Sequence, residues 1–185
     1  MTSQRKNIAS AVIALAAAVV LVFGFNVDLF FWFDDPQALE SPATTSAVVV
    51  NVIDGDTFTA DIGTTTESVR LIGIDTPEIT WPSKDNDLTK PEAECFGWEA
   101  REALQGYVSD REVVLAADAR QPTRDVYDRL LAYVYVSGEL VNEALLAGGF
   151  ARELTVGAGY EKTKEFKRAQ AVAREGEAGL WAACD

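Results

Sequence analysis

The chain contains no histidine among its 185 residues. This absence excludes serine–histidine and cysteine–histidine catalysis, so any hydrolysis must depend on carboxylates, arginine, lysine, tyrosine or a hard metal ion. Cysteine is also rare. The only two, Cys95 and Cys184, are too far apart in sequence to form a local metal knuckle, and no histidine is present to complete a zinc site. We therefore expect no zinc chemistry.

Positive charge is scarce as well. The sequence has 16 Lys and Arg against 29 Asp and Glu, which gives a net charge of −13. Proteins that capture nucleic acid by simple electrostatic attraction usually carry a basic patch or are basic overall. The acidic balance argues against this mode of capture, but a small cluster of arginines around a metal ion can still be positive inside an acidic surface.

The N-terminal region contains a long apolar stretch, from Ile8 to Phe25. As a helix it would span about 27 Å at ~1.5 Å per residue, enough to cross a membrane. Arg5 and Lys6 precede it and acidic residues follow it, so the positive-inside rule places the rest of the chain outside the cell. We predict that residues 1–33 form a single-pass membrane anchor. The alternative is a cleaved signal peptide and a secreted protein, but no small-x-small site closely follows the stretch.

The remaining sequence predicts a linker and one α+β domain. Residues 34–46 are polar with two prolines, which is typical of a linker, and the domain is expected over 47–185. Alternation of β-branched residues predicts strands, and helical spacing predicts helices, at 48–53, 57–62, 67–74, 92–108, 112–117, 129–136, 140–149 and 160–174. Of these segments, 92–108, 140–149 and 160–174 are the predicted helices, and the other five are the predicted strands. Three strands, a helix and two strands is the order of a five-stranded OB-fold barrel, although a mixed α+β sandwich has the same strand count.

Two acidic clusters lie at the ends of predicted strands. Asp54 and Asp56 flank a glycine, and Asp75 comes three residues before Glu78. Hard cations such as calcium take oxygen ligands from carboxylates, backbone carbonyls and water, so these clusters are candidates for a metal site. Each fragment taken alone is also a common turn sequence, and that structural interpretation stays open at this point.

Four segments together indicate a family. VIDGDTF at 52–58, RLIGIDTPE at 70–78, DVYDRLLAYVYV at 125–136 and VNEALLAGGFA at 141–151 resemble, in order and spacing, the staphylococcal-nuclease-like (thermonuclease) family. The resemblance extends from about Val48 to Trp181. It implies an OB-fold phosphodiesterase that depends on calcium and cuts DNA and RNA to products ending in a 3′-phosphate.

The resemblance also implies a calcium site. Asp56 and Asp75 match the family's calcium-ligating aspartates, and Thr76 is expected to contribute its backbone carbonyl. Pro77 restricts the residue before it to an extended conformation, which would fix the direction of that carbonyl.

The same resemblance assigns the chemistry to three further side chains. Glu78 matches the acid that positions or deprotonates the attacking water, and Arg70 and Arg129 match the pair that grips the phosphate. Guanidinium groups can stabilise the negative charge that builds up on phosphoryl oxygens. Without the resemblance, Arg70 would be interpreted as a surface charge on a strand, and Arg129 as the ion-pair partner of nearby Asp125 or Asp128.

Departures from the family pattern affect substrate contacts. Thr155 stands where the family has a tyrosine beside the substrate phosphate, and Val126 replaces a lysine, so the grip on the nucleotide is expected to be weaker or different. Trp81 follows the acidic cluster in a long loop. It has two interpretations, stacking on a base and packing within the loop. We assign no catalytic role to Tyr133 or Tyr135, which alternate along a strand.

The two cysteines are expected to form a disulfide if the domain lies in an oxidising exterior. A Cys95–Cys184 bond would stabilise the fold by about 4 kcal/mol in the loop-entropy model. Two free thiols are the better interpretation if the domain is cytoplasmic.

Three functions are consistent with this sequence. The first is a monomeric, calcium-dependent endonuclease held at the cell membrane, with its catalytic domain outside and DNA or RNA as substrate. The second is a non-catalytic OB-fold module that binds nucleic acid or protein, in which at least one catalytic acid or arginine would be expected to be lost; none is lost here. The third is a domain that uses calcium only for stability.

Overall fold

The computed structural model describes residues 43–82 and 91–184. The chain divides into two compact units, residues 1–38 and 39–185, and every described residue belongs to the second. The predicted membrane anchor at 1–33 and most of the predicted linker therefore lie outside the described residues. Within the described ranges, no helix is both long enough and apolar enough to span a bilayer.

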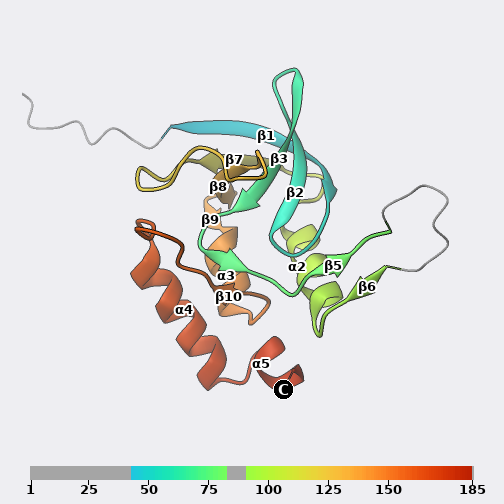
Figure 1. Ribbon diagram of the computed structural model, residues 1–185, viewed down its shortest axis with the longest axis vertical. Coiled ribbons are helices and arrows are strands. Elements are labelled where there is room, and N and C mark those ends of the chain that lie inside the picture. Colours follow the sequence, from blue (N-terminus) through green and yellow to red (C-terminus); the bar gives the residue numbers. More distant parts are fainter. Residues whose placement is uncertain (1–42, 83–90, 185) are drawn as a thin grey trace, which may run out of the picture. The chain divides into compact units, whose positions relative to one another are not determined.

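Five strands form a closed barrel (Figure 1). They are β1 (Thr44–Val52), β2 (Thr57–Ile62), β3 (Thr65–Leu71), β7 (Glu112–Ala116) and β8 (Leu130–Val136). Neighbouring strands pair in the order β3-β2-β1-β7-β8, and a parallel pairing of β3 with β8 closes the ring. Three strands, a helix and two strands joined in this way confirm the predicted five-stranded OB-fold barrel and exclude an open sandwich.

Alternation along the strands builds the core. In β2, Phe58 and Ala60 are fully buried, while Thr59 is half-buried and Asp61 is exposed, as the two-residue period of a strand requires. The turn from β2 to β3 passes through Gly63 at φ +62, a left-handed conformation that favours glycine. Each strand thus presents one apolar face to the barrel interior, and local sequence was sufficient to locate it.

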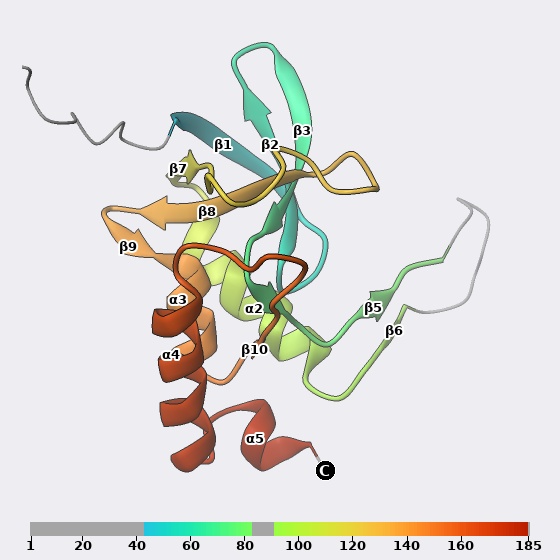
Figure 2. The ribbon, with the colours of Figure 1, turned by 60° about the vertical axis from the view of Figure 1, so that its left-hand side comes forward.

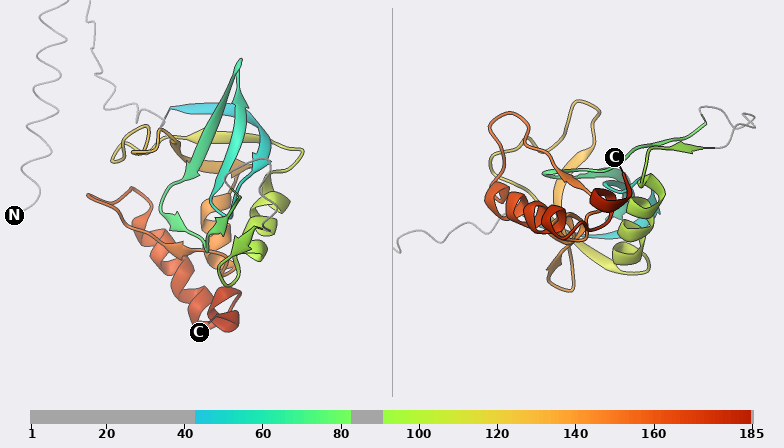
Figure 3. Two further views of the ribbon diagram at one scale, coloured as in Figure 1. Left: turned by 45° about the vertical axis from the view of Figure 1, so that its right-hand side comes forward. Right: turned by 90° about the horizontal axis from the view of Figure 1, so that it is seen from below.

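Four helices lie at one end of the barrel (Figures 2 and 3). They are α2 (Gly97–Val108), α3 (Val141–Ala147), α4 (Thr163–Glu175) and the short α5 (Leu180–Ala183). The prediction of three helices in this part of the chain was therefore one too few, because α5 is a single turn with little periodicity. Buried side chains from α2, α3 and α4, such as Leu104, Leu145 and Phe166, join the core.

The predicted start of the first helix at residue 92 was wrong. Residues Glu92–Ala93 form β6, which pairs antiparallel with β5 (Ile79–Thr80). The helix begins only at Gly97, after Phe96 adopts a left-handed conformation with φ 71. The glutamates and alanines of this segment favour a helix locally, but pairing with a distant strand overrides that preference.

Three other short strands were not predicted from the sequence. β4 (Ile74–Asp75) pairs with β10 (Arg152–Glu153), and β9 (Glu139–Leu140) extends the sheet beside β8. The first barrel strand also begins at Thr44, three residues inside the predicted linker, because Thr44 to Ser46 pair with β7. The domain therefore starts earlier than residue 47.

Asn142 joins β8 to the segment that follows β3. Its fully buried side chain donates to the carbonyls of Ile72 and Ala132 and accepts the backbone N–H of Val134. These hydrogen bonds connect the segment after β3 to β8, where the parallel pairing closes the barrel. The barrel end that bears the candidate site is thus fixed by a polar group in the core.

Candidate active site

The two acidic clusters meet at one end of the barrel. Asp56 lies in the β1–β2 loop and is almost fully buried, and Thr76 follows β4. The backbone N–H of Thr76 donates to Oδ2 of Asp56 at 2.9 Å, and the hydroxyl of Thr57 donates to Oδ1 at 2.9 Å. The predicted convergence of the clusters is therefore present in the structure.

Gly55 allows the close packing of this loop. A Cβ at Gly55 would lie 2.7 Å from Cβ of Ala100 in α2 and 2.9 Å from Cβ of Thr76. Only a residue without a side chain permits this approach. The Asp-Gly-Asp sequence therefore forms a turn, which is one of the two interpretations left open by the sequence. The same turn packs the buried Asp56 against Thr76 and α2.

Arg70 lies between the two clusters. It is the last but one residue of β3, is largely buried, and forms ion pairs with both Asp56 and Asp75; its Nη2 lies 3.1 Å from Oδ1 of Asp75. Burial lowers the pKa of this guanidinium, and the charge of Asp75 partly offsets the effect. The interpretation of Arg70 as a surface charge was wrong, since its side chain is 11% exposed.

Arg129 approaches the same site from the start of β8. Its Nε donates to Oδ2 of Asp125 at 2.7 Å, and its Nη1 lies 3.5 Å from the hydroxyl of Thr57, the residue bonded to Asp56. The ion pair considered for Arg129 is thus formed with Asp125. This pair orients the guanidinium toward the Thr57 side of the carboxylate cluster.

Asp125 is held in its ionised form. Burial alone would raise its pKa, but hydrogen bonds from the backbone and side chain of Arg129 and from the N–H of Tyr127 outweigh burial and lower it. A carboxylate that stays ionised at neutral pH keeps Arg129 in one orientation. The exposed ring of Tyr127 lies against the same guanidinium, with 5.3 Å between the Arg129 Cζ and the ring centroid.

Glu78 lies beyond β4, on the exposed side of the cluster. Partial burial raises the pKa of its carboxyl, the charge of Asp54 raises it further, and Arg70 opposes both. The pKa of the buried Asp54 is raised as well, mainly by desolvation. A carboxylate with a raised pKa is a stronger base, which suits a residue that accepts a proton from water.

The oxygen atoms around Asp56 fit a hard cation. The described residues contain no group of three or more His, Cys, Asp or Glu side chains arranged to hold a metal ion. The predicted set consists instead of the carboxylates of Asp56 and Asp75, which share Arg70 as their positive partner. Thr76 completes the set, and its backbone N–H is bonded to Asp56. The hydroxyl of Thr76 is buried and has no hydrogen-bond partner. An all-oxygen set is of the kind that hard cations take and soft metals do not.

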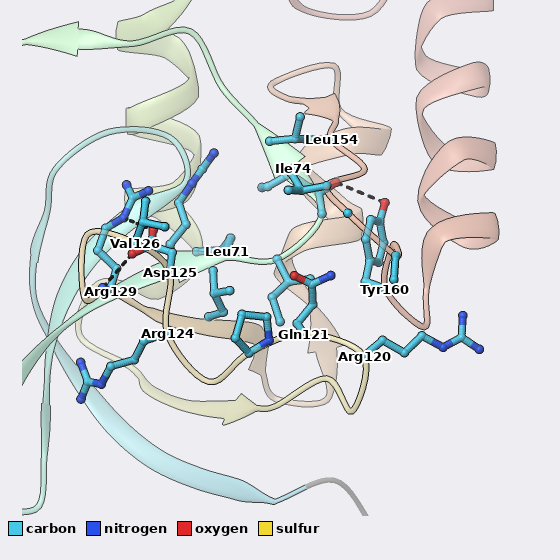
Figure 4. Close-up of a pocket in the computed structure, with 18 residues that line it drawn as sticks. Leu71, Ile74, Arg120, Gln121, Arg124, Asp125, Val126, Arg129, Leu154 and Tyr160 are labelled. Carbon is cyan, nitrogen blue, oxygen red and sulfur yellow. Dashed lines mark hydrogen bonds and ion pairs between the residues drawn. The ribbon is translucent and has the colours of Figure 1, made fainter.

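A cavity of about 550 Å³ opens beside the arginines (Figure 4). Its wall is mostly apolar, including Leu71, Ile74 and Tyr160, and its charged members are Arg70, Arg120, Arg124, Asp125 and Arg129. The side chains of Asp56, Asp75 and Glu78 are not part of this wall. Arg70 therefore contacts the carboxylates of Asp56 and Asp75 and also borders this space, which is large enough for a small organic group.

The residues that depart from the family pattern lie at the edge of this cavity or next to it. Val126 lines the cavity but is 92% exposed, so it holds no neighbour in place. The hydroxyl of Thr155 donates to Glu153, away from the arginines. Neither residue contacts Arg70 or Arg129 through a hydrogen bond.

Trp81 and Tyr133 are both engaged by the fold. The indole N–H of Trp81 donates to the carbonyl of Ile53 at 3.2 Å, and its ring meets Trp98 edge-on at 5.8 Å. These contacts support the packing interpretation, and stacking of Trp81 on a base stays a prediction. Tyr133 is buried, and its hydroxyl donates to the carboxylate of Asp118.

Sequence reasoning missed three groups that shape the site. Thr57 connects Arg129 to Asp56, Asp125 holds Arg129, and Glu94 hydrogen-bonds the backbone of Glu78. Asp125 had been considered only as a competing partner. Thr57 follows Asp56 directly in sequence, which is the one local signal available, whereas nothing in the sequence connects Glu94 to residue 78.

Comparison with known proteins gives a consistent result. The family model described as staphylococcal nuclease homologue matches residues 68–183. The thermonuclease of Staphylococcus hyicus is 29% identical over 96% of this chain and 98% of its own length. The thermonuclease of Staphylococcus intermedius is 34% identical over 80% of this chain and 81% of its own length. The SPbeta prophage-derived endonuclease YokF of Bacillus subtilis is 35% identical over 70% of this chain and 41% of its own length.

Proposed function

This chain belongs to the staphylococcal nuclease family, and on that premise we propose that it is a calcium-dependent endonuclease that acts outside the cytoplasm. Family membership and the thermonuclease and endonuclease names of its relatives make it a nuclease, a hydrolase of phosphodiester bonds. The finer proposal is that it cuts DNA and RNA to products ending in a 3′-phosphate, as a monomer.

The proposal rests mainly on the arrangement of two arginines around two carboxylates. Arg70 joins the carboxylates of Asp56 and Asp75, and Arg129 reaches the same cluster through Thr57. Two guanidiniums beside two carboxylates can hold a phosphate and a hard cation at adjacent positions. The full set of catalytic side chains is present, which favours an enzyme over a binding module.

The arginines would bind the phosphate. Both line the cavity, so a phosphate entering it meets their guanidinium groups. Each planar guanidinium can donate two parallel hydrogen bonds to phosphate oxygens and stabilise the charge that grows on them during attack. Burial of Arg70 strengthens this interaction, because water screens it less.

Glu78 would orient the attacking water and accept its proton. Its raised pKa makes the carboxylate a better base, and its exposed position gives water access. Asp56, Asp75 and the backbone carbonyl of Thr76 would hold calcium. When bound, calcium supplies positive charge near the phosphate and lowers the pKa of a coordinated water.

The location outside the cytoplasm rests on two features. Positively charged Arg5 and Lys6 precede the apolar N-terminal stretch, and acidic residues follow it. The cysteines Cys95 and Cys184 form a disulfide, which persists mainly in oxidising compartments. A chain expressed in intact cells should therefore digest nucleic acid added to the medium. Activity released only by cell lysis would contradict this placement.

Digestion assays test the activity itself. The full-length chain should cleave single-stranded and duplex DNA with calcium and not with a chelator, and Arg70→Ala and Glu78→Gln should each abolish most of the cleavage. Arg111→Ala, which removes one exposed positive charge on the α2–β7 turn, is the matched control and should cleave normally. A folded protein that binds calcium and cleaves nothing would point to a non-catalytic OB-fold module.

A further inference from the structure

The proposed base, Glu78, has little core packing to hold it. It is exposed, and it lies in the short segment between β4 and β5, each only two residues long. An exposed side chain on such a segment keeps its position only if its backbone is fixed. The contacts that fix this backbone therefore decide whether the carboxylate stays near the acidic cluster.

Glu94 fixes the backbone of Glu78 from both sides. The N–H of Glu78 donates to Oε2 of Glu94 at 3.2 Å, and the N–H of Glu94 donates to the carbonyl of Glu78 at 3.0 Å. The adjacent pairs of β5 and β6, Ile79 with Ala93 and Thr80 with Glu92, continue the same ladder. Glu94 is therefore the residue that pairs with Glu78, the proposed base, at the end of this ladder.

The start of α2 packs against the backbone of Pro77 and Glu78. A Cβ built on Gly97 would lie 3.1 Å from the carbonyl oxygen of Glu78 and 3.2 Å from that of Pro77. Gly97 is buried and is the first residue of the helix. The Pro77–Glu78 segment thus rests directly on the helix terminus, and a shift of that terminus would displace it.

Cys95 lies between these two supports and is bonded to Cys184. Cys184 follows α5, which is itself anchored, since Leu180 is buried and its N–H donates to the carbonyl of Gly149 at 2.8 Å. The disulfide therefore connects β6 and the start of α2 to a fixed part of the domain. Without it, the pair of β5 and β6 would lose its only covalent cross-link to α5 among the described residues.

We propose that Glu94 and the Cys95–Cys184 disulfide are positioning elements for Glu78, so that breaking either one lowers turnover without unfolding the protein. The proposal rests on the nuclease function proposed above. It assigns the disulfide a catalytic consequence in addition to stability, and it makes activity dependent on the oxidation state of these two sulfurs.

The redox step is a simple exchange. A dithiol reductant such as dithiothreitol donates two electrons and two protons to the Cys95–Cys184 bond. The S–S bond breaks, each sulfur leaves as a thiol, and the reductant closes into a cyclic disulfide. Reoxidation of the pair reverses the change.

Steady-state kinetics of the full-length chain test the proposal. The double variant Cys95→Ser/Cys184→Ser and the variant Glu94→Ala should each lower kcat about 10-fold with KM changed less than about 2-fold, because displacement of a reacting group by a fraction of an ångström is costly. Glu94→Gln, whose amide oxygen still accepts the N–H of Glu78, should keep kcat within about 2-fold of the wild type. A dithiol should lower the activity of the wild type and leave the double serine variant unchanged.

Tyr133→Phe separates positioning from general stability. It removes a hydrogen bond to Asp118 in a different part of the barrel, so Tm should fall while kcat at a temperature well below Tm stays normal. If Glu94→Ala and the double serine variant behave in the same way, with lower Tm and normal kcat, the disulfide and Glu94 are purely structural and the proposal is overturned.

Hydrogen exchange provides a readout independent of activity. The amide of Glu78, which donates to Glu94, should exchange about 10-fold faster in the double serine variant than in the wild type, while the amide of Val134, which donates to buried Asn142, should not change. Unchanged exchange at Glu78 would refute the positioning role. A wild type that does not cleave nucleic acid would refute the proposed function instead, so the two failures are distinguishable.

Discussion

Replacement of Arg70 by methionine is expected to destabilise the domain strongly without calcium and only weakly with it. The guanidinium is the shared positive partner of Asp56, whose side chain is 2% exposed, and of Asp75, whose side chain is 50% exposed. Methionine fills a similar volume and carries no charge. Arg70→Met therefore leaves the buried carboxylate of Asp56 without its counter-charge.

The magnitude follows from burial. Removal of one partner of a buried ion pair costs roughly 3–5 kcal/mol, because the other charge stays buried and uncompensated. The half-exposed Asp75 is screened by water and adds little. The two hydrogen bonds that Asp56 receives from Thr57 and Thr76 remain in place, so we expect the low end, about 3 kcal/mol.

Calcium should restore most of this loss. A cation at Asp56 and Asp75 supplies the missing charge, and at about 100 times its Kd a ligand stabilises the folded state by about 2.7 kcal/mol. The wild type should gain less from calcium than Arg70→Met, because in the wild type Arg70 already neutralises both carboxylates and repels a second cation. Activity should be lost in either condition, since the phosphate loses one of its two guanidinium partners.

Urea unfolding at neutral pH provides the assay, with calcium or with a chelator present. The measured quantity is the free energy of unfolding of the wild type, of Arg70→Met and of Arg111→Met, which removes an exposed charge. A loss for Arg70→Met that is equal in the two conditions would show that calcium does not bind at these carboxylates. A larger calcium effect on the wild type than on the variant would refute the idea that Arg70 and calcium neutralise the same groups.

Three further results are expected. Asn142→Ala should lower the free energy of unfolding by about 3 kcal/mol in denaturant titrations, because at least two buried backbone groups lose their partner; a change below about 1 kcal/mol would show that water replaces the amide. The pKa of Asp125 is lowered in the folded protein. Its contribution to stability is therefore complete above the pKa that this carboxyl has in the unfolded chain, and it is lost as the pH falls through the pKa that it has in the folded protein. Asp125→Asn should therefore make the free energy of unfolding depend less on pH at acidic pH, and it should weaken the hold on Arg129. An unchanged pH dependence would show that Asp125 does not stabilise the fold through its charge. Gly55→Ala should reduce cleavage more than 10-fold at saturating calcium, since the added Cβ would lie 2.7 Å from that of Ala100 and must displace the loop; normal activity would show that the loop adapts.

The five barrel strands were predictable because their signal is local. Alternation in segments such as Thr57 to Ile62 reflects one buried and one exposed face, and each residue contributes to that pattern regardless of what the strand pairs with. The order of strands and helix then indicated the OB-fold. The first helix was placed five residues too early, because the pairing of Glu92 and Ala93 with β5 depends on residues far away in the sequence.

The site was predictable only in part. Motif order predicted roles for Asp56, Asp75 and Glu78, because the resemblance compares residues at matching positions. It did not identify Glu94, whose role depends on a strand pairing and leaves no pattern in its own surroundings. A functional role was predicted for Arg70, but its burial between two carboxylates appeared only once β3 and β4 were placed together.

The sequence by itself therefore determined the family, the barrel and the identity of the chemical groups, since these depend on residue types, their order and their local spacing. Only the tertiary structure decided how those groups are paired: Arg70 with both aspartates, Arg129 with Asp125, and Glu78 with Glu94 beside the disulfide. The physical reason is that a charge is stabilised by the partner that lies within a few ångströms of it. Those distances are set by the packing of segments that are remote along the chain.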